Sequence, residues 1–182
     1  MNPFYPKFEE QMNDLFKEKS FDEMTREERK IAIAKDVIAR MDMEKLNLKR
    51  GTYFDGIVKE KIGYSDSLQL VVDKLEQGCT VCAIGAVFLS HVRLFNQVSG
   101  EVVSRYGSEA VQIFSHDLIA SVKDCFTHNE MLRLERIFEE GDISYTPQTR
   151  IRRAMEYIIQ NNGEVPYDDD IVYQPKDKKE GY

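Results

Sequence analysis

One uncharged stretch limits the folds open to this chain more than any other feature. From Gly78 to Ser90 the sequence has no charged residue, and Val81 to Leu89 is apolar throughout. A helix built from these residues is apolar on every side, so other parts of the protein must surround it. The stretch is shorter than the roughly 20 residues that span a bilayer. We therefore predict a buried central helix over residues 79–95.

Most of the remaining sequence has the apolar period of amphipathic helices. Apolar residues recur three and four positions apart between charged ones. Capping-box patterns beginning at Thr25 and Thr127 mark two helix starts, and Pro147 marks a third. Besides the central helix, we expect helices over 4–19, 25–43, 68–77, 108–122, 127–140 and 146–163. The sequence therefore predicts an all-α fold, a single bundle of about six or seven helices within residues 1–163.

Two segments interrupt the helical period. It is lost over residues 46–54, around Gly51, where we expect a loop or a short extended segment. From Glu164 onward the chain contains two prolines, three consecutive aspartates and few apolar residues. This composition predicts a mobile acidic tail over residues 164–182. The tail has six acidic side chains against three lysines, so it contributes −3 to the net charge of −7.

Charge and cysteine content indicate the class of partner and the compartment. With 25 Lys and Arg against 32 Asp and Glu, the mean field repels phosphate backbones and anionic lipids, so we expect neither nucleic acid nor a membrane as partner. A local basic patch of Lys45, Lys49, Arg50 and Lys59 is the feature that favours nucleic acid. The first residues show no signal-peptide core, and three cysteines cannot all pair within one chain. We therefore expect a soluble, cytoplasmic protein.

Three cysteines and one histidine have the spacing of zinc ligands. Two residues separate Cys79 from Cys82, and two separate Cys125 from His128. Three thiolates and an imidazole would complete a tetrahedral zinc shell. Alternatively, the cysteines are core residues, since free cysteine is among the most buried residue types, and His128 is exposed beside a helix start. Zinc is the only cofactor that the sequence suggests.

Cys79 also has one feature of a catalytic nucleophile. It follows Gly78 at the expected start of the central helix, where the helix dipole lowers the pKa of a thiol. A nucleophile needs a base, and His91 on the same helix is about 18 Å away along the axis. Only His116 or His128 can approach Cys79 through the tertiary fold. Because no complete catalytic set emerges, we assign no catalytic residue, and a cysteine-dependent or zinc-dependent enzyme is the alternative hypothesis.

Five arginines near the ends of two predicted helices are a further candidate site: Arg133, Arg136, Arg150, Arg152 and Arg153. The last three fall in the first turns of a helix, where the dipole disfavours cations by a few tenths of a kcal/mol. One interpretation is ion pairing with the nearby acids at 139, 140 and 142 or with the aspartates at 168–170. The other is a site for an anion or for an acidic group of a partner.

The two ends of the chain have side chains suited to binding another protein. The first predicted helix has an aromatic face of Phe4, Tyr5, Phe8 and Phe16. The tail combines acidic and aromatic residues in Tyr167, Asp168, Asp169, Asp170 and Tyr173. Aromatic rings supply buried anchor area at interfaces, and an acidic segment can wrap a basic partner. The leading hypothesis is therefore a helical regulator that works by protein–protein interaction, with self-association left open. Alternatively, the first helix docks on the core and the tail only aids solubility.

Two short stretches resemble a known group of domains. Gly51-Thr52-Tyr53 and the run Cys82-Ala83-Ile84-Gly85-Ala86 are similar to small helical domains of bacterial and phage genomes that have a Cys-Ala-x-Gly-Ala helix. The resemblance covers about a quarter of the chain, and the shared pattern concerns helix packing. It implies a helical fold and no particular activity.

Overall fold

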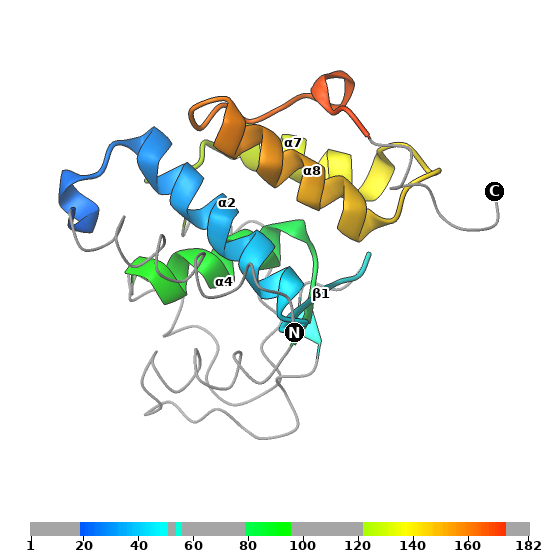
Figure 1. Ribbon diagram of the computed structural model, residues 1–182, viewed down its shortest axis with the longest axis horizontal. Coiled ribbons are helices and arrows are strands. Elements are labelled where there is room, and N and C mark those ends of the chain that lie inside the picture. The colour runs from blue at the N-terminus through cyan, green and yellow to red at the C-terminus, as the bar shows by residue number, and fades with distance from the viewer. Residues whose placement is uncertain (1–18, 51–53, 56–78, 96–121, 174–182) are drawn as a thin grey trace, which may run out of the picture.

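Each of the four long helices in the described part of the chain packs against two others. The computed structural model describes residues 19–50, 54–55, 79–95 and 122–173. The helices are α2 (Arg26–Asp42), α4 (Ala83–Phe95), α7 (His128–Glu140) and α8 (Pro147–Gln160), with 3₁₀ turns η1 (Phe21–Glu23) and η2 (Asp168–Asp170). Helix α2 contacts α8 and α4, and α7 also contacts α8 and α4, so the four close into a ring (Figure 1).

The described part of the chain is mostly helical, as the sequence predicts. Four of the predicted helices are present, and three of them, α2, α7 and α8, begin within one residue of the expected start. The predicted helices over 4–19, 68–77 and 108–122 lie outside the described residues, apart from Val122, which is buried in a turn before α7. The expected number of six or seven helices is therefore not established.

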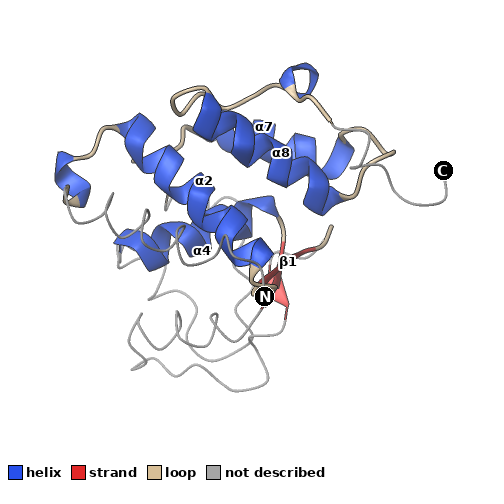
Figure 2. Cartoon of the chain, in the orientation of Figure 1, coloured by secondary structure: helices blue, strands red, loops and turns tan. Residues whose placement is uncertain are grey.

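The prediction that the central helix begins at residue 79 is wrong. Residues Cys79–Val81 form strand β3, which lies between β1 (Leu46–Leu48) and β2 (Phe54–Asp55) (Figure 2). Strand β3 pairs in parallel with β1 and antiparallel with β2. Thr80 and Val81 are β-branched and suit a strand, but only pairing with these distant segments decides the outcome. The extended conformation expected within 46–54 is confirmed by β1.

The central helix itself is surrounded on all sides, as its composition predicts. Every residue of α4 from Ala83 to Val92 is buried, including the polar Ser90 and His91. The apolar side chains of α2, α7 and α8 complete one continuous core around it. No helix within the described ranges is long and apolar enough to cross a membrane.

Three helices begin at the caps that the sequence indicates. The Thr25 hydroxyl accepts a hydrogen bond from the Glu28 backbone N–H at 3.2 Å, and the Glu28 carboxylate accepts one from the Thr25 N–H at 2.8 Å. Helix α7 repeats this reciprocal box with Thr127 and Glu130. At α8 the Thr146 hydroxyl accepts from the Thr149 N–H at 3.0 Å. These contacts satisfy backbone donors that a helix leaves unpaired at its start.

The boundary predicted at residue 163 does not separate packed from unpacked chain. After α8, Gly163 has a φ of 88° and lies so close to the backbone of Glu27 that a side chain there would clash. Beyond it, Val165, Pro166 and Ile171 are buried, and Val165 and Ile171 belong to the core. Residues 164–173 are therefore part of the folded body, because their few apolar side chains find core contacts. Residues 174–182 lie outside the described part.

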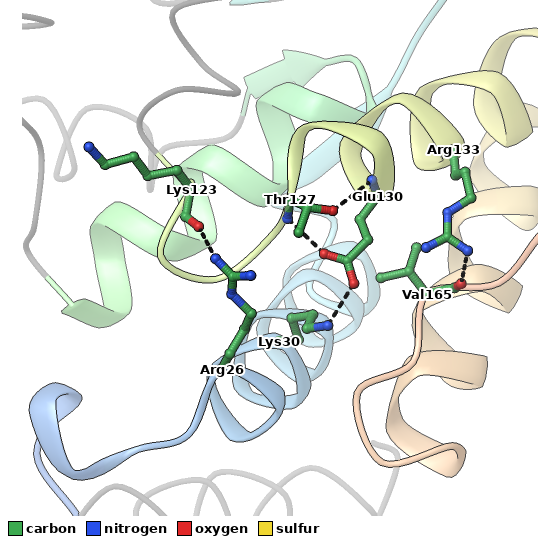
Figure 3. A network of polar contacts seen from close by, with 7 residues as sticks. All are labelled: Arg26, Lys30, Lys123, Thr127, Glu130, Arg133 and Val165. Carbon is green, nitrogen blue, oxygen red and sulfur yellow. Dashed lines mark hydrogen bonds and ion pairs between the residues drawn. The ribbon is translucent and has the colours of Figure 1, made fainter.

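A buried ion pair ties helix α2 to the start of α7 (Figure 3). The Lys30 ammonium donates to the Glu130 carboxylate at 2.7 Å, and both side chains are largely shielded from solvent. The same carboxylate accepts the Thr127 backbone N–H at 2.7 Å. Burial raises the pKa of Glu130, but these hydrogen bonds outweigh it, and the pKa lies below its ordinary value. Glu130 is therefore held as a charged carboxylate between two helices.

Removing Lys30 tests how much this buried pair contributes. We expect Lys30→Met to lower the free energy of unfolding by about 3 kcal/mol, because it leaves a shielded carboxylate without its counter-ion. The matched control is Lys19→Met. Lys19 donates to Glu28 at 2.6 Å, and Glu28 has the same capping-box position in α2 that Glu130 has in α7. The pair of Lys19 and Glu28, however, is exposed to solvent. The control should cost no more than about 1 kcal/mol. Urea unfolding measures both, and equal losses in the two variants would contradict the assignment.

Candidate functional site

The cysteines are the first candidates, and the two whose side chains are described are buried and free. Cys82 immediately precedes α4, and its Sγ accepts the Gly85 backbone N–H at 3.4 Å. Burial nevertheless raises the pKa of Cys82 to about 11, and it raises the pKa of Cys125 to about 12. Both thiols therefore remain protonated at neutral pH and are poor nucleophiles.

The structure removes the reason for treating Cys79 as an activated thiol. That interpretation places Cys79 at a helix N-terminus, but Cys79 is the first residue of β3, and α4 begins only at Ala83. The positive end of the α4 dipole therefore does not lie at Cys79. Its side chain lies outside the described residues.

The predicted zinc ligands do not form a recognisable metal site in the described part of the chain. Cys125 is fully buried in the turn before α7, whereas His128, the first residue of α7, is exposed. Within the described ranges no group of three or more His, Cys, Asp or Glu side chains is placed to hold a metal ion. No observation here therefore favours zinc, and packing accounts for Cys82 and Cys125.

The five candidate arginines do not converge on one point. Three form ion pairs: Arg136 with Glu140 at 3.5 Å, Arg152 with Asp42, and Arg153 with Glu156. Arg133 donates to the Val165 carbonyl oxygen at 2.8 Å and lies over the Tyr167 ring. Arg150 is buried and donates to the Gly141 carbonyl oxygen. Arg150 is therefore the member of this set whose charge most needs an explanation.

The C-terminal segment presents an acidic and apolar surface beside the loop between α7 and α8. Tyr167 is 64% exposed, Val172 is 73% exposed and Ile143 in the loop is 69% exposed. Asp168, Asp169 and Asp170 form η2 and are exposed as well. Tyr173 stacks on Tyr145 with ring centroids 3.9 Å apart, which holds the segment against the loop. We call this surface the acidic edge: Ile143, Tyr167, Asp168, Asp169, Asp170 and Val172.

Phe4, Tyr5, Phe8 and Phe16, the aromatic residues predicted to contact a partner, lie outside the described residues. The first described aromatic is Phe21 in η1, which the Arg29 guanidinium covers at 3.7 Å from the ring centroid. Phe21 packs against Phe95, with centroids 4.8 Å apart, and is part of the core boundary.

His91, which lies too far along its helix to act as a base for Cys79, is a buried polar residue. It is 2% exposed, makes edge contacts with the rings of Phe21 and Phe95, and its Nδ1 has no hydrogen-bond partner among the described residues. Burial lowers its pKa to about 4, the Asp124 carboxylate opposes that shift, and Arg29 adds to it. His91 is thus a neutral core residue at physiological pH. Its burial could have been predicted from the sequence, because His91 directly follows the uncharged stretch that forms the buried helix.

Alkylation of the native protein tests the assignment of the thiols. We expect iodoacetamide to leave Cys82 and Cys125 unmodified in the folded chain, because both thiols are buried and protonated. Both should react fully in urea. Peptide mass spectrometry assigns the label to individual cysteines, with Cys79 as the internal comparison. Rapid native labelling of Cys82 or Cys125 would contradict their burial.

The pH dependence of stability tests His91. The folded chain binds a proton at His91 only near pH 4, whereas the unfolded chain does so at about 6.5. The unfolded chain therefore binds more protons in between, and stability falls as the pH falls. From pH 6.5 to 5 the loss should be about 2 kcal/mol.

The variant His91→Phe removes this titration and fits between two aromatic rings. We expect it to flatten the stability profile over that range, as measured by urea unfolding. The control His128→Gln changes an exposed histidine and should keep the wild-type slope. An unchanged slope in His91→Phe would mean that His91 is accessible to protons in the folded state.

Comparison with known proteins adds no further constraint. No protein-family model matches the chain. No curated protein and no solved structure matches it either. What this chain does must therefore be inferred from its own side chains.

Proposed function

We propose that the chain is a cytoplasmic protein that acts by binding another protein through the acidic edge. The observation behind this proposal is an acidic segment that is anchored to the core yet leaves large apolar side chains in solvent. Val165 and Ile171 are buried, while Tyr167 and Val172, which flank η2, are exposed. Exposed apolar groups that gather beside charged ones are typical of interaction surfaces.

Several contacts hold the acidic edge in place before any partner binds. Arg133 donates to the Val165 carbonyl oxygen and covers one face of Tyr167 at 4.4 Å from the ring centroid. The Tyr167 backbone N–H donates to the Asp170 carboxylate at 2.8 Å and closes the η2 turn. The stack of Tyr173 on Tyr145 anchors the far end. A surface that is already ordered loses less conformational entropy on binding.

The chemistry of the acidic edge favours a basic, apolar partner segment. Asp168, Asp169 and Asp170 are three adjacent exposed carboxylates, and the whole chain has a net charge of −7. Such a field attracts cations and speeds their association. The Tyr167 ring and the Val172 side chain supply apolar area, and tyrosine is a frequent energetic anchor at interfaces. The expected partner therefore presents lysines or arginines beside an apolar side chain.

The rival hypothesis, a cysteine-dependent or zinc-dependent enzyme, has no specific observation in its favour. The two described thiols are buried and protonated, and Cys79 is not at a helix start. The two free thiols instead suit a reducing compartment, which supports placing the protein in the cytoplasm. A regulatory or inhibitory role follows if occupation of the acidic edge blocks the partner's own contacts.

A designed peptide tests the acidic edge. An amphipathic helix with leucines on one face and lysines on the other should bind the full chain, and its affinity should fall as salt is added. We expect Tyr167→Ala to raise the Kd about tenfold, because an aromatic anchor is lost. Asp169→Asn should raise it less. Fluorescence anisotropy of the labelled peptide measures these affinities.

Two controls make the result specific. The variant Asp22→Asn removes one exposed carboxylate from η1, far along the chain from the acidic edge, and should leave the Kd within about twofold. A peptide with glutamates in place of the lysines should not bind. Equal losses in Asp22→Asn and Asp169→Asn, or no loss in Tyr167→Ala, would reject the acidic edge as the binding surface.

A further inference from the structure

Arg150 is a buried cation that forms no ion pair with a described residue. It is 1% exposed and lies in the first turns of α8. One guanidinium nitrogen, Nη1, donates to the Gly141 carbonyl oxygen, but Nε has no hydrogen-bond partner in the described part of the chain. Within the described part of the chain it forms no ion pair with a carboxylate. Leaving a charge and a donor unsatisfied in the interior is costly, so an acceptor is expected there.

A second arginine lies at the same end of α7. Arg50 donates through Nε to the Phe138 carbonyl oxygen at 3.4 Å. Phe138 and Gly141 are three positions apart, which is a rise of about 4.5 Å along a helix. The two guanidinium groups therefore donate to carbonyl oxygens that lie near each other. After burial, Arg50 is the largest single influence lowering the pKa of Arg150, while Tyr173, Asp168 and Glu139 each raise it. The two guanidinium groups are therefore close enough for their charges to interact.

A hydroxyl group adds a second unsatisfied donor. The Tyr173 hydroxyl is buried and has no hydrogen-bond partner among the described residues, while the ring is held by stacking on Tyr145. Tyr173 and Arg150 are close enough for each to shift the pKa of the other. Burial raises the pKa of Tyr173 to about 12, so the hydroxyl keeps its proton and can donate.

We propose that Arg50, Arg150 and Tyr173 form a binding site for a small oxyanion, either a phosphate or a carboxylate group. Its oxygens accept from the Arg150 Nε–H, from the Arg50 guanidinium and from the Tyr173 hydroxyl. The anion also places negative charge between two cations that otherwise repel each other. Arg50 is exposed, so an anion would reach the site from solvent on the side of Arg50. This site does not require the acidic edge to be occupied.

Titration with inorganic phosphate and, separately, with acetate tests the site and distinguishes the two anion chemistries. Sodium chloride holds the ionic strength constant, and calorimetry on the full chain measures the Kd. We expect saturable binding of at least one anion. Arg50→Gln and Tyr173→Phe should each weaken that binding about tenfold, because each removes one donor to the anion. Arg50 is exposed, and Tyr173→Phe keeps the stacked ring, so both variants should fold.

The matched control is Arg136→Gln, which removes one positive charge from α7 but affects only an exposed ion pair with Glu140. Its Kd should stay within about twofold of the wild type. Binding of phosphate alone or of acetate alone supports the site and names the ligand class. The proposal is overturned if neither anion binds beyond the effect of chloride, as expected if water satisfies these donors. It is also overturned if Arg50→Gln and Tyr173→Phe bind as tightly as Arg136→Gln.

Discussion

The Glu130 carboxylate serves as a helix cap and as a link between two helices at the same time. It closes the cap of α7 by accepting the Thr127 backbone N–H, and it pairs with Lys30 from α2. One carboxylate thus fixes both where α7 begins and where it lies relative to α2. Glu28 makes the same cap at α2, but its lysine partner is in solvent. The two capping boxes differ in burial: the ion pair of Glu130 is shielded from solvent, whereas that of Glu28 is exposed. The local cap of α7 therefore also acts as a contact between two helices.

Helix α7 then positions the surfaces that we connect with function. Its side chain Arg133 holds the backbone of the C-terminal segment at Val165, and its last carbonyls receive Arg50 and Arg150. The acidic edge and the proposed oxyanion site are adjacent, because Tyr173 belongs to the oxyanion site and also anchors the acidic edge by stacking on Tyr145. The Asp168 carboxylate of the acidic edge acts on the charge of Arg150 as well. Cations at the end of a helix are favoured by its dipole, which partly explains why two arginines gather there. The unsatisfied Nε of Arg150 is not explained by the dipole alone.

Local signals predicted the starts of three of the four described helices well. The caps at Thr25, Thr127 and Thr146 use side chains within three residues of the helix start, so no distant contact is needed to find them. The uncharged stretch likewise predicted that α4 is buried on all sides. The candidate site was predicted less well. The five arginines are neighbours in the sequence, yet each has its own partner, because successive side chains on a helix point in different directions.

The sequence by itself determined where the three capped helices α2, α7 and α8 begin and that α4 must be buried, since capping and the local pattern of apolar residues act over a few residues. Only the tertiary structure decided that Cys79–Val81 is a strand, because β1 and β2 supply its hydrogen bonds from distant positions. It also decided that the start of the acidic tail belongs to the body, since Val165 and Ile171 find the core. The tertiary structure also decided which charged side chains are buried. Lys30 and Arg150 look like ordinary surface residues in the sequence, and their burial depends on groups brought close by folding.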